Sequence, residues 1–212
     1  MNTIVENFKK IKSNINNNNV NIIAVSKTFS FEHIKPLVDF GHSHFGENKV
    51  QEADTKWSSV KKNNPNLKLH MIGRLQSNKA KKAVELFDYV HSLDSEKLAT
   101  ALAKHENNLN KKLSYFIQVN VGNEEQKSGI SANLVDDFYT YCKSNLKLNI
   151  IGLMAIPPND GNEEIHFKYL YETNTSLGLK NLSMGMSGDY LKAIKYKSTF
   201  LRIGSKIFGN RD

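Results

Sequence analysis

The chain has 212 residues, of which 39% are hydrophobic and 24% are charged, and its formal net charge at pH 7 is +8. This composition is ordinary for a globular protein, and no run approaches the ~18 apolar residues that a membrane span requires, so we expect no membrane association. The lysines are dispersed over predicted helix faces rather than gathered with aromatic residues in one strand, so we also expect no nucleic-acid partner.

Eight short apolar runs are predicted strands, and each is followed by a helical pattern. The predicted strands are residues 22–26, 44–45, 68–72, 89–92, 114–121, 149–154, 182–185 and 200–204. The predicted helices that follow them are residues 31–40, 47–62, 77–86, 95–108, 132–144, 163–177 and 188–195, with a short last helix from Ser205. An extra helix over residues 2–13 precedes the first strand, because Ile4, Val5, Phe8 and Ile11 recur at helical spacing.

The strict alternation of strand and helix predicts an α/β protein with a parallel sheet, and eight such units predict a single (β/α)8 TIM barrel with an extra N-terminal helix. An open doubly wound sheet is the alternative. Against it, no G-x-G-x-x-G segment follows the first strand, and no Walker-type loop is present. No linker or change of composition divides the chain, so residues 1–212 are predicted to form one domain.

The chain contains one cysteine, Cys142, which excludes an internal disulfide. It lies in an apolar, helically periodic stretch and is predicted to be a core thiol. The first ten residues lack the apolar segment of a secretory signal. We therefore expect a reducing, cytoplasmic location.

Lys27 directly follows the first predicted strand. Ligands of parallel α/β sheets bind at the carboxyl ends of the strands, so this amine is predicted to stand at a ligand site. The edge of a low-dielectric core disfavours an ammonium ion and lowers its pKa, which would allow Lys27 to form a Schiff base with a carbonyl compound. The alternative is a lysine that extends its charged end into solvent.

Two segments that contain glycine end the last two strands: L-S-M-G-M-S-G-D at 182–189 and R-I-G-S-K-I-F-G at 202–209. In TIM barrels these loops commonly hold a phosphate, because small residues allow close approach and backbone N–H groups at a helix start attract anions. Ser187 is predicted to open the seventh helix, and Gly204 and Ser205 to begin the eighth. The alternative is that Ser187 is only a helix cap and the glycines are turn residues.

Arg202 completes the predicted site. Arginine occurs only at Arg74, Arg202 and Arg211. An arginine in so lysine-rich a chain indicates a position that uses its planar, permanently charged group, and this points to Arg202. The last strand closes a barrel against the first, which places Arg202 beside Lys27. A phosphate at the glycine loops and a carbonyl at Lys27 would bring a ring across Arg202, and this arrangement fits pyridoxal 5′-phosphate (PLP).

The sequence resembles the pyridoxal phosphate homeostasis proteins, which are related to the barrel domain of alanine racemase. The matching segments extend nearly from end to end. They are A-V-S-K-T at 24–28, F-G-E-N-K-V-Q-E at 45–52, H-M-I-G-R-L-Q-S-N-K at 70–79, Q-V-N-V-G-N-E-E-Q-K-S-G at 118–129, G-L-M-A-I at 152–156, L-S-M-G-M-S at 182–187 and R-I-G-S-K-I-F-G at 202–209. Phe29-Ser30 and Leu69 depart from the residues usual in the family, at helix-entry and packing positions.

The resemblance implies that Lys27 holds PLP as an internal aldimine and that Arg202 faces the pyridine nitrogen. It places Ser187, Gly204 and Ser205 on the phosphate-binding positions and Asn48 in the pocket. It implies a protein that binds, buffers and delivers PLP in the cell, affecting amino-acid and keto-acid balance, without clear catalysis and therefore without catalytic residues. Apo PLP-dependent enzymes are the implied recipients.

Two enzymatic alternatives stay open: a weak PLP-dependent amino-acid racemase, and an aldolase-type barrel that uses Lys27 without a cofactor. The racemases that resemble this barrel take their second acid/base from a C-terminal domain, in a dimer. This chain ends at Asp212, so we expect that domain to be absent and the protein to be a monomer. His42 and His44 could share a strand face, but no third ligand has suitable spacing, so no metal site is predicted.

Overall fold

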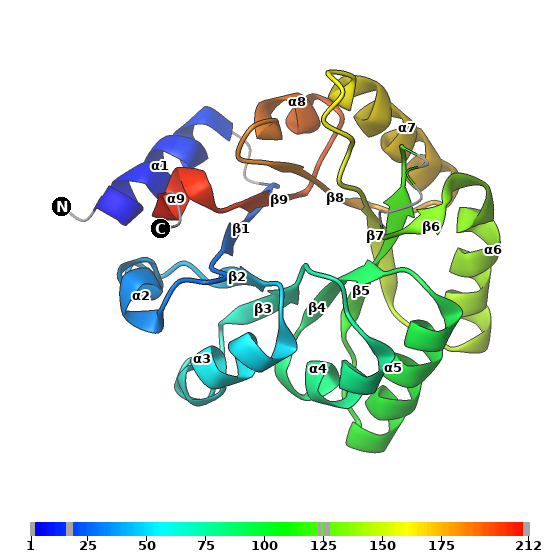
Figure 1. The fold of residues 1–212 in the computed structure, drawn as a ribbon, viewed down its shortest axis with the longest axis horizontal. Helices are drawn as coiled ribbons and strands as arrows, with labels where there is room; N and C mark the ends of the chain where they lie inside the picture. The colour runs from blue at the N-terminus through cyan, green and yellow to red at the C-terminus, as the bar shows by residue number, and fades with distance from the viewer. Residues whose placement is uncertain (1–2, 16–18, 123, 125–127, 210–212) are drawn as a thin grey trace.

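The computed structural model describes residues 3–15, 19–122, 124 and 128–209, and its centre is a closed barrel of eight parallel strands (Figure 1). The barrel strands are β1 (Asn21–Val25), β2 (His44–Glu47), β3 (Lys68–Met71), β4 (Tyr89–Leu93), β5 (Ser114–Asn120), β7 (Ile150–Met154), β8 (Asn181–Met186) and β9 (Phe200–Ile203). Each pairs in parallel with its neighbours, and the β1–β9 and β4–β5 pairs complete the circle. The predicted TIM barrel is therefore confirmed, and the open doubly wound sheet is excluded.

Helices surround the barrel on its outside (Figure 1). They are α1 (Thr3–Ile15), α2 (Phe31–Asp39), α3 (Val50–Asn63), α4 (Ala80–Leu86), α5 (Glu96–Leu109), α6 (Val135–Thr140), α7 (Glu163–Ser176), α8 (Tyr190–Lys195) and α9 (Ser205–Phe208), with short 3-10 turns at Ser77–Lys79 and Ala132–Leu134 and a π turn at Tyr141–Asn145. No helix within the described ranges combines the length and the apolar content needed to cross a bilayer.

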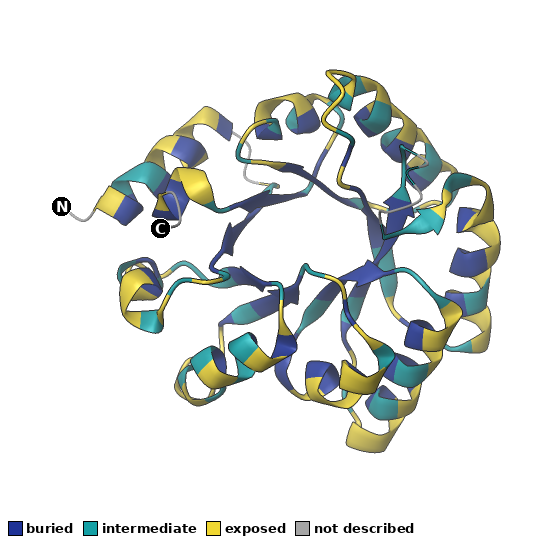
Figure 2. Cartoon of the chain, in the orientation of Figure 1, coloured by how far each residue is buried: buried dark blue, intermediate teal, exposed yellow. Residues whose placement is uncertain are grey.

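The core has two parts. The larger part lies between the strands and the helices. Each helix turns its buried face toward the strands and its exposed face outward (Figure 2). The smaller part consists of Ile23, Phe116, Met154 and Phe200, on strands whose alternate residues belong to the larger part. Because successive side chains of a strand point to opposite faces, this smaller cluster fills the barrel interior. Cys142 is fully buried in the outer part, as predicted, and burial raises the pKa of its thiol to about 12.

The leading helix α1 packs beside the last helix α9, so the two ends of the described chain lie close together (Figure 1). Asn7 donates a hydrogen bond from its side-chain nitrogen to the carbonyl oxygen of Ile207 at 3.2 Å. The extra N-terminal helix was predicted from residue 2, which lies outside the described residues. In the structure α1 packs against α2 and α9, the helices next to the β1–β9 strand pair that closes the barrel.

Two local predictions were wrong, and one short strand was not predicted. The helix predicted over 47–62 begins only at Val50, because Glu47 is the last residue of β2. The helix predicted from 188 begins at Tyr190 with Asp189 before it, so Ser187 stands in the preceding turn and does not open the helix. A short strand β6 (Ile130–Ser131), which pairs with β5 outside the ring, was not predicted. Its two residues are too few to give a periodic pattern.

Candidate functional site

Strands β1 and β9 bring Lys27 and Arg202 to the same mouth of the barrel. Ile23 of β1 is in register with Arg202 of β9, and Ala24 with Ile203. Lys27 follows two residues after the end of β1, and Gly204 follows directly after β9. Residues from the first and last strands are therefore neighbours at the carboxyl edge, where parallel barrels bind ligands.

A pocket of about 750 Å³ opens at this mouth. All six residues predicted from the sequence to bind a cofactor line it: Lys27, Asn48, Ser187, Arg202, Gly204 and Ser205. The other lining residues are Val25, Ile72, Ile156, Met186, Gly188 and Gly209. Among the described residues that line the pocket there is no carboxylate, while an amine, a guanidinium and two hydroxyls are present. Its size suits a small ligand, and its charge favours an anionic one.

The guanidinium of Arg202 is held inside the barrel. Arg202 is only 4% exposed, and its Nη1 donates to the carbonyl oxygen of Ser183 at 2.7 Å and to Ser183 Oγ at 2.6 Å. Its Nη2 donates to the carbonyl oxygen of Ala155 at 2.9 Å. Burial lowers the pKa of Arg202 to about 10, which the charge of Asp189 partly opposes, so the group stays protonated at neutral pH.

These three hydrogen bonds engage three of the five N–H groups of Arg202, and two therefore remain for a ligand. Within the described residues no carboxylate forms an ion pair with this buried cation. A buried charge without a counter-ion is costly unless it has other partners. The arrangement fits a ligand that presents an unprotonated ring nitrogen or another acceptor to Arg202.

The phosphate-side residues come from two adjacent turns. Ser187 lies between β8 and α8, Gly204 lies between β9 and α9, and Ser205 is the first residue of α9. Ser187 Oγ accepts a hydrogen bond from the backbone N–H of Lys206 at 3.4 Å, which links the two turns. Ser187 and Ser205 both line the pocket, together with the small residues Gly188 and Gly204.

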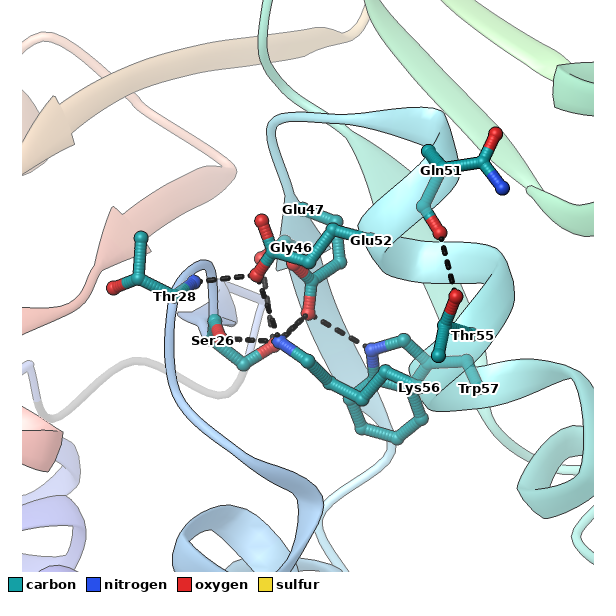
Figure 3. Close-up of polar contacts among 9 residues, drawn as sticks. All are labelled: Ser26, Thr28, Gly46, Glu47, Gln51, Glu52, Thr55, Lys56 and Trp57. Atoms are coloured by element: carbon teal, nitrogen blue, oxygen red, sulfur yellow. Dashed lines mark hydrogen bonds and ion pairs between the residues drawn. The ribbon is translucent and has the colours of Figure 1, made fainter.

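A polar network holds Ser26 and Thr28, the residues on either side of Lys27 in the sequence (Figure 3). Glu47 Oε1 accepts hydrogen bonds from Ser26 Oγ at 2.8 Å, from Trp57 Nε1 at 2.8 Å and from Lys56 Nζ at 3.0 Å. Lys56 Nζ also donates to the carbonyl oxygen of Ser26 at 2.8 Å. The residue that precedes Lys27 is thus held through both its side chain and its backbone.

The same network holds the residue that follows Lys27. Glu52 Oε1 accepts from the backbone N–H of Thr28 at 2.5 Å and from Lys56 Nζ at 3.1 Å. Thr28 has a φ of 70°, a left-handed conformation that is unfavourable for a β-branched residue. Its hydrogen bond to Glu52 compensates for part of that strain, and together these contacts fix the backbone on either side of Lys27.

Sequence reasoning missed this network. Glu47 was assigned to a helix start, and Lys56 was one of many helix lysines expected on a solvated surface. In the structure Glu47 is fully buried and the Lys56 side chain is 7% exposed. Burial raises the pKa of Glu47, and the charge of Lys56 opposes that effect. A carboxylate directly after the apolar pair Phe45-Gly46, with a lysine four residues after Glu52, was the signal available in the sequence.

The two histidines considered for a metal site do not form one. The ring nitrogen Nε2 of His42 contacts the carbonyl oxygen of His44 at 2.9 Å, and His44 Nδ1 lies 2.9 Å from His70 Nε2. Among the described residues no three or more His, Cys, Asp or Glu side chains are arranged so that they could hold a metal ion. His70 and His91, which are buried in the barrel, were not singled out from the sequence.

Comparison with known proteins gives consistent matches along the whole chain. Residues 1–212 match the family described as "Alanine racemase, N-terminal domain". A "Pyridoxal phosphate homeostasis protein" of Pasteurella multocida is 37% identical over 229 aligned positions, which cover 99% of this chain and 98% of that protein.

Solved structures agree with the sequence matches. The structure of PipY of Synechococcus elongatus, described as having PLP bound, superposes with a TM-score of 0.87 at 33% identity and covers 97% of this chain and 100% of that one. An alanine racemase of Clostridium difficile shares the fold at 12% identity, with a TM-score of 0.77 over 99% of this chain and 57% of that one.

Proposed function

Since the chain belongs to the pyridoxal phosphate homeostasis proteins and to the family of the alanine racemase N-terminal domain, we propose that it binds PLP and serves in intracellular PLP homeostasis. In this role the protein buffers the cofactor and delivers it to apo PLP-dependent enzymes, and so affects amino-acid and keto-acid balance. The whole chain acts as one PLP-binding domain. The structure of a relative with PLP bound supports this proposal.

One observation carries the proposal: the pocket at the barrel mouth gathers Lys27, Arg202 and the two turns with small residues. Lys27 supplies the amine that bonds covalently to the aldehyde carbon. Ser187, Gly204 and Ser205 hold the phosphate with hydroxyl and backbone donors, and Asn48 is a further pocket residue. The amine, the anion-holding turns and the ring-facing guanidinium together match the three polar ends of PLP.

Arg202 determines what the bound cofactor can do. PLP supplies an electron sink whose strength depends on a proton at the ring nitrogen. A guanidinium donates hydrogen bonds and does not take up that proton, so Arg202 keeps the nitrogen unprotonated and the sink weak. In the described part of the pocket no carboxylate is present that could keep the ring nitrogen protonated and so strengthen the electron sink. This setting suits storage of the cofactor.

The protein is proposed to have no catalytic turnover. Racemisation needs a second acid/base on the face of the substrate opposite Lys27. Of the pocket residues that the structure describes, none is a tyrosine, histidine or carboxylate that could take this role. The proposal includes a cytoplasmic monomer that exchanges PLP with other proteins. The names of the relatives, which refer to homeostasis, support the proposed absence of catalytic turnover.

Borohydride reduction followed by peptide mapping tests the PLP proposal. The purified protein is incubated with PLP, reduced, digested and analysed by mass spectrometry, and a pyridoxyl-phosphate adduct is expected on Lys27. Lys27→Ala is expected to remove the adduct and the yellow colour while the circular dichroism spectrum stays native. Lys104→Ala, at an exposed position on α5, is the matched control and keeps both. An adduct on another lysine, or on none at saturating PLP, contradicts the proposal.

Solvent deuterium exchange tests the absence of turnover. The PLP-loaded protein is incubated with L-amino acids in D2O, and no progressive deuterium entry at the α-carbon is expected. Sustained exchange that disappears in Lys27→Ala would instead establish a weak racemase-like enzyme.

A further inference from the structure

A continuous chain of hydrogen-bonded side chains crosses the barrel interior and ends at Arg202. His44 Nδ1 lies 2.9 Å from His70 Nε2, and His70 Nδ1 lies 2.9 Å from His91 Nε2. His91 Nδ1 lies 2.8 Å from Ser183 Oγ, which accepts from Arg202 Nη1 at 2.6 Å. The three histidines come from the adjacent strands β2, β3 and β4, and the chain reaches β8 and β9 across the barrel.

Arg202 sets the direction of every hydrogen bond in this chain. A guanidinium can only donate, so Ser183 Oγ accepts from it and has one hydrogen left to donate. Within the described residues the other partner of this hydroxyl is His91 Nδ1. If His91 Nδ1 donated to the second lone pair of Ser183 Oγ, the buried hydroxyl hydrogen would have no acceptor among the described residues, which is costly. His91 Nδ1 is therefore the unprotonated acceptor of that hydrogen. His91 then carries its hydrogen on Nε2 and donates to His70 Nδ1. By the same argument His70 donates from Nε2 to His44 Nδ1.

The surroundings keep these rings neutral and still. His70 and His91 are fully buried, and burial holds their pKa values well below the usual range for histidine. The neighbouring histidines and, for His91, the charge of Arg202 act in the same direction. His70 stacks on Tyr89 with ring centres 4.3 Å apart, and His91 stacks on Phe116 at 4.4 Å. Neither ring can rotate without losing its stacking contact and two hydrogen bonds.

We propose that His91, oriented by His70 and His44, is a positioning residue that acts through Ser183 to fix the guanidinium of Arg202 toward the ligand pocket. This inference rests on the proposed PLP site, because it states how the ring-facing group of that site is aimed. With the Ser183 hydroxyl hydrogen committed to His91, a lone pair of Ser183 Oγ always faces Arg202. Without His91 the hydroxyl can turn that hydrogen toward the guanidinium and release one of its three anchors.

Histidine nitrogen NMR of the cofactor-free protein tests the direction of the chain. Long-range ¹H–¹⁵N correlation spectra are expected to show His70 and His91 as neutral rings protonated at Nε2, with the signals assigned through single-histidine variants. A ring protonated at Nδ1 in either residue would overturn the proposal. Since no PLP is present, this measurement stands even if the proposed function fails.

Substitution of His91 tests its effect on Arg202. His91→Phe keeps a ring against Phe116 but removes the acceptor for Ser183, and it is expected to weaken PLP binding about tenfold and to shift the absorption spectrum of the bound cofactor. His91→Asn restores an acceptor near the Nδ1 position and is expected to recover most of both properties.

The control is His105→Phe on α5, which is not one of the hydrogen-bonded histidines and should bind PLP like the wild type. A His91→Phe protein with native circular dichroism, unchanged affinity and an unchanged spectrum would contradict the positioning role. If His91→Phe does not fold, the His91→Asn protein and the ring tautomers of the wild type still decide between the outcomes.

Discussion

Glu47 shows how one buried side chain can organise a binding loop. A single oxygen, Oε1, accepts from three donors, while Oε2 is buried without a hydrogen-bond partner in the described part of the chain. The carboxylate is compensated mainly by Lys56, which is itself almost fully buried (Figure 3). Removal of one member of such a pair leaves the other as an uncompensated buried charge, so the cost is much larger than for a surface pair.

Glu47→Ala is therefore expected to lower the free energy of unfolding by about 3 kcal/mol or more, because it also leaves the Ser26 hydroxyl and the Trp57 N–H without their acceptor. Urea unfolding followed by circular dichroism measures this change. If the variant is still folded, we also expect weaker PLP binding, since the backbone before Lys27 loses its support.

The exposed ion pair between Lys35 and Asp39 on α2 provides the control. Both side chains are more than half exposed, so solvent screens their interaction and Asp39→Ala should change the unfolding free energy by less than about 0.5 kcal/mol. Equal effects of the two substitutions would show that the Glu47 network contributes no more than a surface contact.

Arg202 illustrates a different residue-scale constraint. Its group reaches two carbonyl oxygens and a hydroxyl and still has donors left for a ligand. Lysine has only three donors on one nitrogen and could not span Ser183, Ala155 and the pocket at once. The presence of arginine at position 202, in a chain that mostly uses lysine, therefore has a geometric explanation.

At the scale of elements, the separation between neighbouring strands depends on small residues. Gly152 of β7 is in register with Asn181 of β8. A β-carbon at Gly152 would overlap the backbone oxygen of Asn181 and lie 3.0 Å from the ring of Phe116. A backbone atom cannot move aside as a flexible side chain would, so the two strands would have to part.

Gly152→Ala is expected to destabilise the protein by about 3 kcal/mol and to lower the thermal midpoint. Gly188→Ala is the matched control, because a β-carbon there meets no atom within 4 Å, and it should leave the midpoint nearly unchanged. Differential scanning calorimetry of both variants checks the prediction, and a stable Gly152→Ala protein would show that β7 and β8 can separate cheaply.

At the scale of the whole molecule, the barrel interior makes stability depend on pH. Burial lowers the pKa values of His70 and His91 in the folded state, whereas in the unfolded chain both have ordinary values near 6.5. The unfolded state therefore binds more protons below that pH. The stabilisation from each neutral ring is complete above the unfolded pKa and is lost as the pH falls below it.

Between pH 7.5 and pH 5.5 the free energy of unfolding is expected to fall by about 1.4 kcal/mol for each of these two histidines. Urea titrations at the two pH values measure the fall, and His91→Phe should reduce it by one such step. Glu47 acts in the opposite direction, since burial raises its pKa, but it contributes equally to both proteins and cancels in the comparison. An identical pH dependence of wild type and His91→Phe would refute the assignment of a neutral His91.

The sequence alone determined the fold and six of the residues that line the pocket. Strictly alternating apolar strands and amphipathic helices allow few arrangements other than a closed parallel barrel, and in such a barrel the residues after the first and last strands meet at one mouth. Lys27, Arg202 and the two turns with small residues could be placed near each other for this reason, since their proximity follows from strand order rather than from side-chain detail.

Only the tertiary structure decided how those residues are held. The contacts of Glu47 with Lys56 and Trp57, and of Arg202 with Ser183 and Ala155, join elements that no local pattern connects. The histidine chain likewise depends on the register between strands, because a shift of one residue would turn each ring to the other face of the sheet. Periodicity shows which face of an element is buried, but the polar partners found there are set by how the strands align.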